Sequence, residues 1–416
     1  MQARHAPPEW IDSSLALRRL LATLLIIALG SGVMYVVSVV LPAVQAEFGV
    51  SRADAAMPYT LLMVGFGMGG VLMGKVADRY GVMPPLVLGG VATCLGYVLA
   101  AQASNLWVFS LTHGLILGLM GSSVTFAPLM ADTAQWWNRR RGIAVAVCAS
   151  GNYLAGAFWP PIVQWGVTHW GWRDTYWALG LVCGGGMLLL SLMFRLRPPK
   201  TVVAPVSSQA AMTSWASDTP LGMPQAQALT WLSVAGVACC VAMAMPQVHI
   251  VAYCTDLGFG PARGAEMLSL MLASGIVSRL ASGYICDRIG GLRTLVLGSV
   301  LQGTALLLFL PLEGLSALYF ASALFGLFQG GIVPSYAIIV REYFPAVRAG
   351  VQTGTVIMAT LLGMALGGWM SGAIFDLTGS YKAAFVNGIA WNLLNLSIAV
   401  YFYRRARGLG QLRAVA

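Results

Sequence analysis

The sequence predicts an all-α membrane protein, with twelve transmembrane helices in two pseudo-symmetric six-helix bundles and both termini in the cytoplasm. Composition is the first reason. Of the 416 residues, 58% are apolar and 9% are charged, whereas about a quarter of the residues in a soluble domain are charged. So few charges cannot give a chain of this length a water-facing surface, which excludes an ordinary cytoplasmic enzyme.

The length of the apolar runs is the second reason, because about 20 residues are needed to cross a bilayer. The first run follows a polar N-terminus and is too long for the core of a cleaved signal peptide, so it is read as a span. Twelve segments qualify: 18–42, 56–76, 83–103, 106–130, 142–165, 174–194, 228–255, 264–286, 293–312, 315–340, 349–375 and 383–403.

These segments divide the chain into domains. We expect a cytoplasmic N-terminus at 1–17, six-helix bundles at 18–194 and 228–403, a cytoplasmic linker at 195–227 and a cytoplasmic basic tail at 404–416. The linker is rich in Ser, Thr, Pro and Gln, a composition typical of a mobile connection. The seven cysteines lie in or at the ends of apolar runs, so no disulfide framework is expected.

The basic residues predict the orientation, because cytoplasmic loops carry the excess of Lys and Arg. With the N-terminus inside, four of the 24 Lys and Arg residues lie outside: Arg52, Arg173, Arg263 and Lys382. Arg279 lies within a span, which leaves 19 on the cytoplasmic side. The opposite orientation would place those 19 residues outside.

The two halves of the chain also repeat one another. One repeated group is Gly74, Asp78, Arg79 and Gly81 after the second span and Gly283, Asp287, Arg288 and Gly290 after the eighth, 209 residues later. The same offset relates Trp172, Arg173 and Tyr176 to Tyr381, Lys382 and Phe385. Two six-helix halves related by duplication are typical of a transporter with its solute site between the halves near mid-membrane.

At these residues the chain resembles the major facilitator superfamily over essentially its whole length. The cytoplasmic signature Gly-x-x-x-Asp-Arg-x-Gly occurs twice, at 74–81 and 283–290. Within the superfamily the chain resembles the branch of monocarboxylate transporters and oxalate/formate antiporters. The residues that carry this resemblance are Gly30-x-Gly32-x-x-Tyr35, Leu41-Pro42, Glu47-Phe48-Gly49, Ser51-Arg52-Ala53 and Gly275-x-x-x-Arg279-x-x-x-Gly283.

This resemblance is closest to bacterial carriers of lactate with a proton, and implies a multi-pass protein of the bacterial inner (plasma) membrane. Two departures from the branch matter. Animal monocarboxylate carriers have an acidic residue one turn before the buried arginine, where this chain has Gly275. Oxalate exchangers have a lysine in the eleventh span, whereas 349–375 contains neither Lys nor Arg, which argues against a dicarboxylate.

Arg279 is the strongest candidate for a substrate contact. An arginine near the membrane centre costs about 2.5–3.5 kcal/mol on insertion scales, so it should face a partner or a wet cavity. Its planar guanidinium stays charged and matches a carboxylate in bidentate fashion. The alternatives are a structural ion pair or a side chain that snorkels toward the cytoplasm.

A carrier of a carboxylate with a proton also needs a group that titrates. Asp256 and His249 are the candidates for proton coupling, because their spacing of seven places them on one face of the seventh span, after Pro246. A carboxyl group in a drying pocket is favoured in its protonated form. The alternatives are a solvated Asp256 at the outer helix end and a packing role for His249.

Polar residues in other spans are candidates to orient the rest of a small hydroxy acid, although hydrogen bonds between helices are the alternative for each. They are Asn152, Tyr336, Tyr35 and Gln329. The duplicated pairs Asp78–Arg79 and Asp287–Arg288 are interpreted as cytoplasmic gates, with a local turn as the alternative.

We therefore predict a secondary active transporter, not an enzyme, that carries a small monocarboxylate such as L-lactate in symport with a proton by alternating access. It would function as a monomer in the lipid bilayer, without metal, nucleic acid or any cofactor except the coupling proton. A carboxylate anion exchanger without proton coupling is the main alternative. An efflux pump for drugs or cations and a membrane sensor with a carrier fold are further ones.

Overall fold

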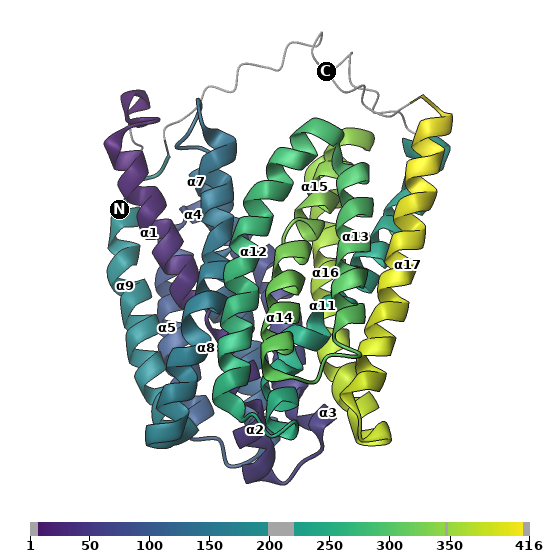
Figure 1. Ribbon diagram of the computed structural model, residues 1–416. Coiled ribbons are helices and arrows are strands. Elements are labelled where there is room, and N and C mark those ends of the chain that lie inside the picture. Colours follow the sequence, from purple (N-terminus) through teal and green to yellow (C-terminus); the bar gives the residue numbers. More distant parts are fainter. Residues whose placement is uncertain (1–6, 199–219, 346–347, 411–416) are drawn as a thin grey trace. The chain divides into compact units, whose positions relative to one another are not determined.

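The computed structural model describes residues 7–198, 220–345 and 348–410, and long helices dominate these residues (Figure 1). The first half contains α1 (Ser14–Gly30), α2 (Val33–Phe48), α3 (Arg52–Ala55), α4 (Met57–Tyr80), α5 (Met83–Ala101), α6 (Leu106–Leu111), α7 (Ala127–Thr133), α8 (Arg141–Leu179) and α9 (Gly185–Ser191). The second contains α11 (Gln225–Asp256), α12 (Pro261–Ile289), α13 (Gly291–Leu308), α14 (Leu315–Gln329), α15 (Ile332–Tyr343), α16 (Ala349–Thr378) and α17 (Tyr381–Gly408).

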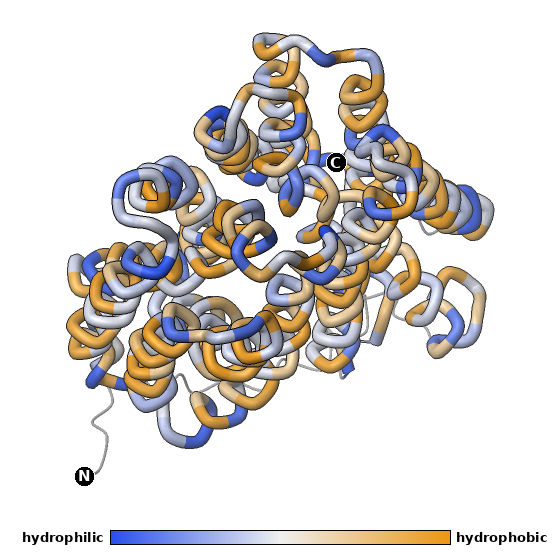
Figure 2. Tube along the Cα trace, turned by 90° about the horizontal axis from the view of Figure 1, so that it is seen from below, coloured by the Kyte–Doolittle hydropathy of each residue, from blue (hydrophilic) through white to orange (hydrophobic). Residues whose placement is uncertain are grey.

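Eleven stretches of the described residues are long and apolar enough to cross a membrane. One of them, Gly142–Phe194, is 53 residues long and is divided at Gly171, whose φ of 81° and ψ of 162° interrupt α8. This stretch therefore supplies two spans, and the described part of the chain contains the twelve predicted. Seen end-on in Figure 2, the helices are largely hydrophobic and the hydrophilic segments gather in the connecting turns.

The backbone confirms the internal repeat at the ends of helices. Gly81 ends α4 and Gly290 precedes α13, 209 residues later, and both have a φ of 84°. Gly49 and Gly258 are separated by the same offset and have φ values of 61° and 83°. Side chains strongly disfavour this left-handed region, so glycine allows the same turn in both repeats.

The chain divides into two compact units. Unit 1 contains Met1–Val202 and Gln247–Ala273, and unit 2 contains Val203–Pro246 and Ser274–Ala416. The division passes through α11 directly after Pro246 and through α12 just before Gly275. The end of α11 and the beginning of α12 therefore belong to the same unit as the first six spans. Most of the linker predicted at 195–227, and part of the tail predicted at 404–416, lie outside the described residues.

Unit 1 packs α5 against the sixth span through glycine. A Cβ at Gly184 would lie 2.6 Å from the backbone nitrogen of Cys94 and 2.8 Å from the carbonyl oxygen of Gly90. The thiol of Cys94 donates to the carbonyl of Gly180 at 3.1 Å. Absence of a side chain thus lets the two backbones approach closely, as is common between membrane helices.

Unit 2 joins α13 and α17 by side-chain hydrogen bonds. The Asn395 amide donates to the Ser299 hydroxyl at 2.8 Å and accepts from the Tyr336 hydroxyl at 2.7 Å. Asn392 donates to Gln302 at 3.0 Å. All five side chains are buried, so their polar groups satisfy one another inside the unit.

Candidate functional site

Arg279 lies in the half of α12 that belongs to unit 2. Val277, Leu280 and Tyr284 are 58%, 51% and 59% exposed and mark the exposed side of this helix. At 3.6 residues per turn, Arg279 projects between about 100° and 160° away from each of them. Its side chain is partly buried and its Nε atom is fully buried. Arg279 is therefore turned away from the surface that would face lipid.

The opposite side of α12 is held against a break in the tenth span, between α14 and α15. A Cβ at Gly330 would lie 2.6 Å from the carbonyl oxygen of Gly275, and the Gly330 amide donates to the Ser278 hydroxyl at 3.1 Å. A Cβ at Gly331 would overlap the side chain of Ser282. These contacts fix the rotation of α12 about its own axis, and with it the direction of Arg279.

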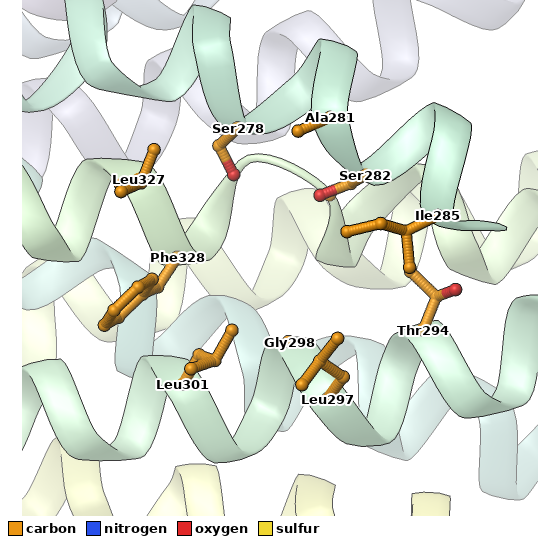
Figure 3. A pocket seen from close by; sticks show the side chains of 11 residues that line it. Ser278, Ala281, Ser282, Ile285, Thr294, Leu297, Gly298, Leu301, Leu327 and Phe328 are labelled. Carbon is orange, nitrogen blue, oxygen red and sulfur yellow. The ribbon is translucent and has the colours of Figure 1, made fainter. Parts of the chain in front are cut away.

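A cavity of about 190 Å³ lies beside these contacts, between α12, α13 and the end of α14. Figure 3 shows Ser278 and Ser282 on α12 opposite Phe328, Leu301 and Leu297. Its lining residues are all uncharged and do not include Arg279. This cavity therefore lacks the cation that a carboxylate requires.

Two of the polar candidates lie deep inside unit 2. Tyr336 is fully buried and donates to Asn395 within the network described above. Gln329 is fully buried at the end of α14, next to Gly330. A substrate could reach either of them only if this packing loosened.

The other two polar candidates are brought together in unit 1. The Tyr35 hydroxyl of α2 donates to Asn152 Oδ1 of α8 at 2.6 Å. A Cβ at Gly156 would lie 2.8 Å from Tyr35 Cζ and would overlap Leu272 of α12. Helices α2, α8 and the beginning of α12 thus meet around Gly156, with the Tyr35–Asn152 pair beside this contact.

The proton-coupling candidates occupy different environments at the end of α11. His249 is fully buried. Asp256 pairs with Arg52 of α3, with 3.2 Å between Arg52 Nη2 and Asp256 Oδ1. The Asp256 side chain is 33% exposed and that of Arg52 only 10%. Asp256 is therefore partly accessible to water and held by a cation at the predicted outer side.

The four gate candidates lie at the predicted cytoplasmic ends and are all exposed: Asp78, Arg79, Asp287 and Arg288. The carbonyl of Arg79 accepts from Arg197 at 3.0 Å. Neither aspartate forms an ion pair with the described residues of its own unit.

Two further ion pairs of unit 1 were, like Arg52–Asp256, not predicted from the sequence. Arg19 binds Asp132 through two hydrogen bonds, at 2.9 and 3.1 Å, and the two side chains are 6% and 3% exposed. Arg173 binds Glu47 at 2.6 Å and also donates to the carbonyl of Ala103. In each pair the acid lies just after an apolar run, Asp132 after 106–130 and Glu47 after 18–42. The residues around each acid do not indicate which arginine binds it.

Comparison with known proteins gives relatives along most of the chain. The sequence model of the Major Facilitator Superfamily matches residues 23–316 and 267–415. Monocarboxylate transporter 13 of Bos taurus is 30% identical over 78% of this chain and 74% of its own length. Monocarboxylate transporter 11 of Mus musculus is 28% identical over 86% of this chain and 80% of its own.

Solved structures show the same fold at low sequence identity. A bacterial homologue of the human lysosomal transporter Spinster, inward-facing and unoccupied, has a TM-score of 0.72 and 12% identity over 97% of this chain and 100% of its own. A peptide transporter POT in complex with sulfate has a TM-score of 0.73 and 12% identity over 95% of this chain and 96% of its own. These structures establish the fold alone.

Proposed function

Because this chain belongs to the Major Facilitator Superfamily and is therefore a multi-pass secondary transporter, not an enzyme, we propose that it carries a small monocarboxylate such as L-lactate together with a proton. Similarity to monocarboxylate transporters 13 and 11 supports the class of substrate. Transport would proceed by alternating access. The observation that carries the proposal is the position of Arg279 within a span, on the side of α12 away from the exposed surface.

Arg279 would hold the substrate carboxylate through two parallel charge-assisted hydrogen bonds. Burial strengthens such a pair because few water molecules compete for the donors. The eleventh span, α16, contains neither Lys nor Arg, so it offers no second cation for the other carboxylate of a dicarboxylate. This composition favours a monocarboxylate.

The Tyr35–Asn152 pair would orient the remainder of the substrate, since each side chain can donate to and accept from a hydroxyl group. Tyr336 and Gln329 stay candidate contacts that depend on loosening of unit 2. Asp256 would bind the coupling proton, because it is partly exposed and could exchange protons with the outside. His249 is the second candidate for the proton.

The pairs Asp78–Arg79 and Asp287–Arg288 would act as gates on the cytoplasmic side, where their exposure leaves them accessible to partners. The excess of basic residues at the same ends supports cytoplasmic termini. A bacterial inner membrane and a functional monomer stay predictions.

The test is uptake of labelled L-lactate into proteoliposomes by wild type, Arg279→Ala and Arg279→Lys. Loss of hydrogen bonds to a charged group costs about 1.5–3 kcal/mol, so Arg279→Ala should raise the half-saturating concentration roughly tenfold to a hundredfold. Arg279→Lys should recover part of the loss. Arg263→Ala is the matched control, because it removes an exposed arginine at the beginning of the same helix. Undiminished uptake by Arg279→Ala would contradict the proposed anchor.

A second candidate function is carboxylate exchange without protons. The Arg52–Asp256 ion pair favours it in one respect, because a carboxylate with a cationic partner is stabilised without a proton. Uptake at two external pH values, with and without internal lactate, separates the two functions. Symport predicts faster net uptake at the lower pH, whereas exchange predicts stimulation by internal lactate and no response to pH.

A further inference from the structure

We propose that Arg52 is a positioning residue that ties closure of the predicted outer end of unit 1 to the charge of Asp256. The Arg52–Asp256 pair forms while Asp256 is ionised and separates when Asp256 takes up a proton from outside. This inference deepens the proposed function and rests on it for the identity of the coupling group.

The position of Arg52 is unusual for its surroundings. It is the first residue of α3, a short helix between the first two spans that lies on the predicted outer side. An arginine there would ordinarily extend into water, yet the Arg52 side chain is only 10% exposed. Ser51 holds the start of α3 by accepting from the Asp54 amide at 3.1 Å. Arg52 thus lies at the capped start of α3 with its side chain largely buried.

The end of α11 presents two sources of negative charge to Arg52. One is the carboxylate of Asp256, at 3.2 Å. The other is the helix itself, because α11 ends at Asp256 and the last carbonyl groups of a helix carry partial negative charge. Protonation of Asp256 removes the larger of these attractions and so weakens the contact between the end of α11 and α3.

Other charged groups on the elements of unit 1 that lie on the predicted outer side form contacts of their own. Asp54 on α3 accepts from the Ser51 hydroxyl at 2.8 Å. At the beginning of α12, Arg263 pairs with Glu266 at 2.9 Å. Glu47 at the end of α2 is bound by Arg173. On α11 itself, His249 lies two turns before Asp256 and is fully buried. Arg52 is thus the cation that the structure places on the Asp256 carboxylate.

The same part of unit 1 is closed by uncharged contacts. The Ser269 hydroxyl of α12 donates to the carbonyl of Ala157 in α8, and Leu272 packs on Gly156. Segment 247–273 is therefore joined to the first six spans by packing along α12 and by the ion pair at the end of α11. Any movement that separates this segment from those spans must break the pair, and Leu272 would then become accessible.

The first experiment measures this separation without reference to any substrate. Leu272→Cys, 1% exposed in the closed arrangement, is labelled from outside with a membrane-impermeant maleimide, and the modified peptide is quantified at external pH 5 to 8. Labelling relative to that of an exposed reference cysteine at the same pH should rise as the external pH falls. Arg52→Gln and Asp256→Asn should each raise labelling several-fold at neutral pH and flatten its pH dependence. The double variant should add little, because both changes break one contact.

Three controls isolate the pair. Maleimide reacts with the thiolate, whose fraction falls as the pH falls, so labelling of Leu272→Cys is divided at each pH by that of Ala262→Cys, which is exposed at the beginning of α12. Arg263→Gln removes another predicted outer arginine and should leave Leu272→Cys labelling unchanged. Arg52→Lys should preserve the pH dependence in part, since the cation is retained. If neither Arg52→Gln nor Asp256→Asn changes the labelling of Leu272→Cys or its pH dependence, the inference is wrong.

The second experiment measures lactate uptake against external pH in the same variants. Arg52→Gln should weaken the dependence of uptake on the external pH, because closure is then no longer tied to the charge of Asp256. Asp256→Asn should abolish the dependence. The two proposals fail in different ways. pH-dependent labelling without lactate uptake would contradict the proposed function but support the role of Arg52. Proton-coupled uptake with labelling that neither variant changes would support the proposed function but contradict the role of Arg52.

Discussion

The α5 contact with the sixth span in unit 1 and the α13–α17 contact in unit 2 occupy equivalent places in the two repeats but use different chemistry. With the offset of 209 residues, Gly90 corresponds to Ser299 and Cys183 to Asn392. Unit 1 brings the helix backbones together at glycines, and unit 2 joins them by buried amides and hydroxyls. One fold therefore tolerates two solutions to helix packing, close approach and hydrogen bonding.

The predicted cytoplasmic ends of the units differ as well. In unit 1, Asp132 forms a buried ion pair with Arg19, whose guanidinium also lies over the rings of Trp136 and Phe194 at 4.6 and 4.4 Å. In unit 2, the nearly equivalent acid is Glu342, which accepts from the Gly291 amide at 3.0 Å at the first turn of α13. Unit 1 thus binds its acid through a buried arginine, whereas the contacts of the acid in unit 2 include a helix N-terminus.

The largest effect is expected from Asp132→Ala, which leaves Arg19 buried without its carboxylate. Breaking a buried pair in this way costs about 3–5 kcal/mol. Glu342→Ala removes contacts to a helix N-terminus and should cost about 0.5–2 kcal/mol. Denaturation in detergent micelles measures both.

A double variant sharpens this comparison. Arg19→Met with Asp132→Leu replaces both charges by apolar groups, and should recover most of the loss because no unpaired charge remains. Equal losses from Asp132→Ala and Glu342→Ala would refute the proposed difference between the two ends.

A smaller but still large effect is expected from Gly184→Leu. The added side chain would meet the Cys94 and Gly90 backbones, and overpacking costs about 1–3 kcal/mol or more. Gly185→Leu is the matched control, since a Cβ there meets nothing within 4 Å. Gly184→Leu alone should lower the melting temperature and reduce the monodisperse peak in size-exclusion chromatography. Equal melting temperatures and peaks for the two variants would mean that the close approach is unimportant.

Asn395→Leu tests the corresponding contact in unit 2. It removes the hydrogen bonds to Tyr336 and Ser299 while keeping a similar volume. Hydrogen bonds between membrane helices average about 0.6 kcal/mol and reach about 1.7 kcal/mol, so the melting temperature should fall less than for Gly184→Leu. A greater fall would reverse the proposed ranking of the two contacts.

The smallest effect concerns the predicted outer ends. Arg173 and its repeat equivalent Lys382 each bind a carboxylate, Glu47 and Glu313 respectively. The hydrogen bond and the charge of Lys382 lower the pKa of Glu313 from 4.5. A lowered pKa means that the pair stabilises the fold above pH 4.5, and that this contribution disappears as the pH falls through the lowered value.

Melting curves against pH measure this contribution. Lys382→Met should reduce stability slightly at neutral pH and not below the titration of Glu313, and added salt should weaken the effect in the wild type. Arg173→Met should cost more, because Arg173 also donates to backbone carbonyls. If the melting temperature of Lys382→Met depends on pH in the same way as that of the wild type, the pair does not contribute to stability.

The candidate site residues show which features a local sequence pattern can predict and which it cannot. Arg279 stands out in the sequence as a single charge in an apolar run, and the structure turns it away from the exposed side of α12. The aspartates proposed as gates were selected from the sequence because they repeat. The partner of Asp256 could not be recognised, because Arg52 is 204 residues away in the chain. The hydrogen bond from Tyr336 to Asn395 could not be recognised either, because Asn395 lies 59 residues further on.

By itself, the sequence determined the number of spans, the duplication and the residues that carry charge into the membrane. Those features follow from hydropathy over about 20 residues and from the spacing of repeated residues, and both can be recognised without knowing how the helices pack. Only the tertiary structure decided which charges are paired, which polar groups satisfy one another, and how α11 and α12 are divided between the two units. These outcomes depend on contacts between residues far apart in the chain, so no local pattern contains them.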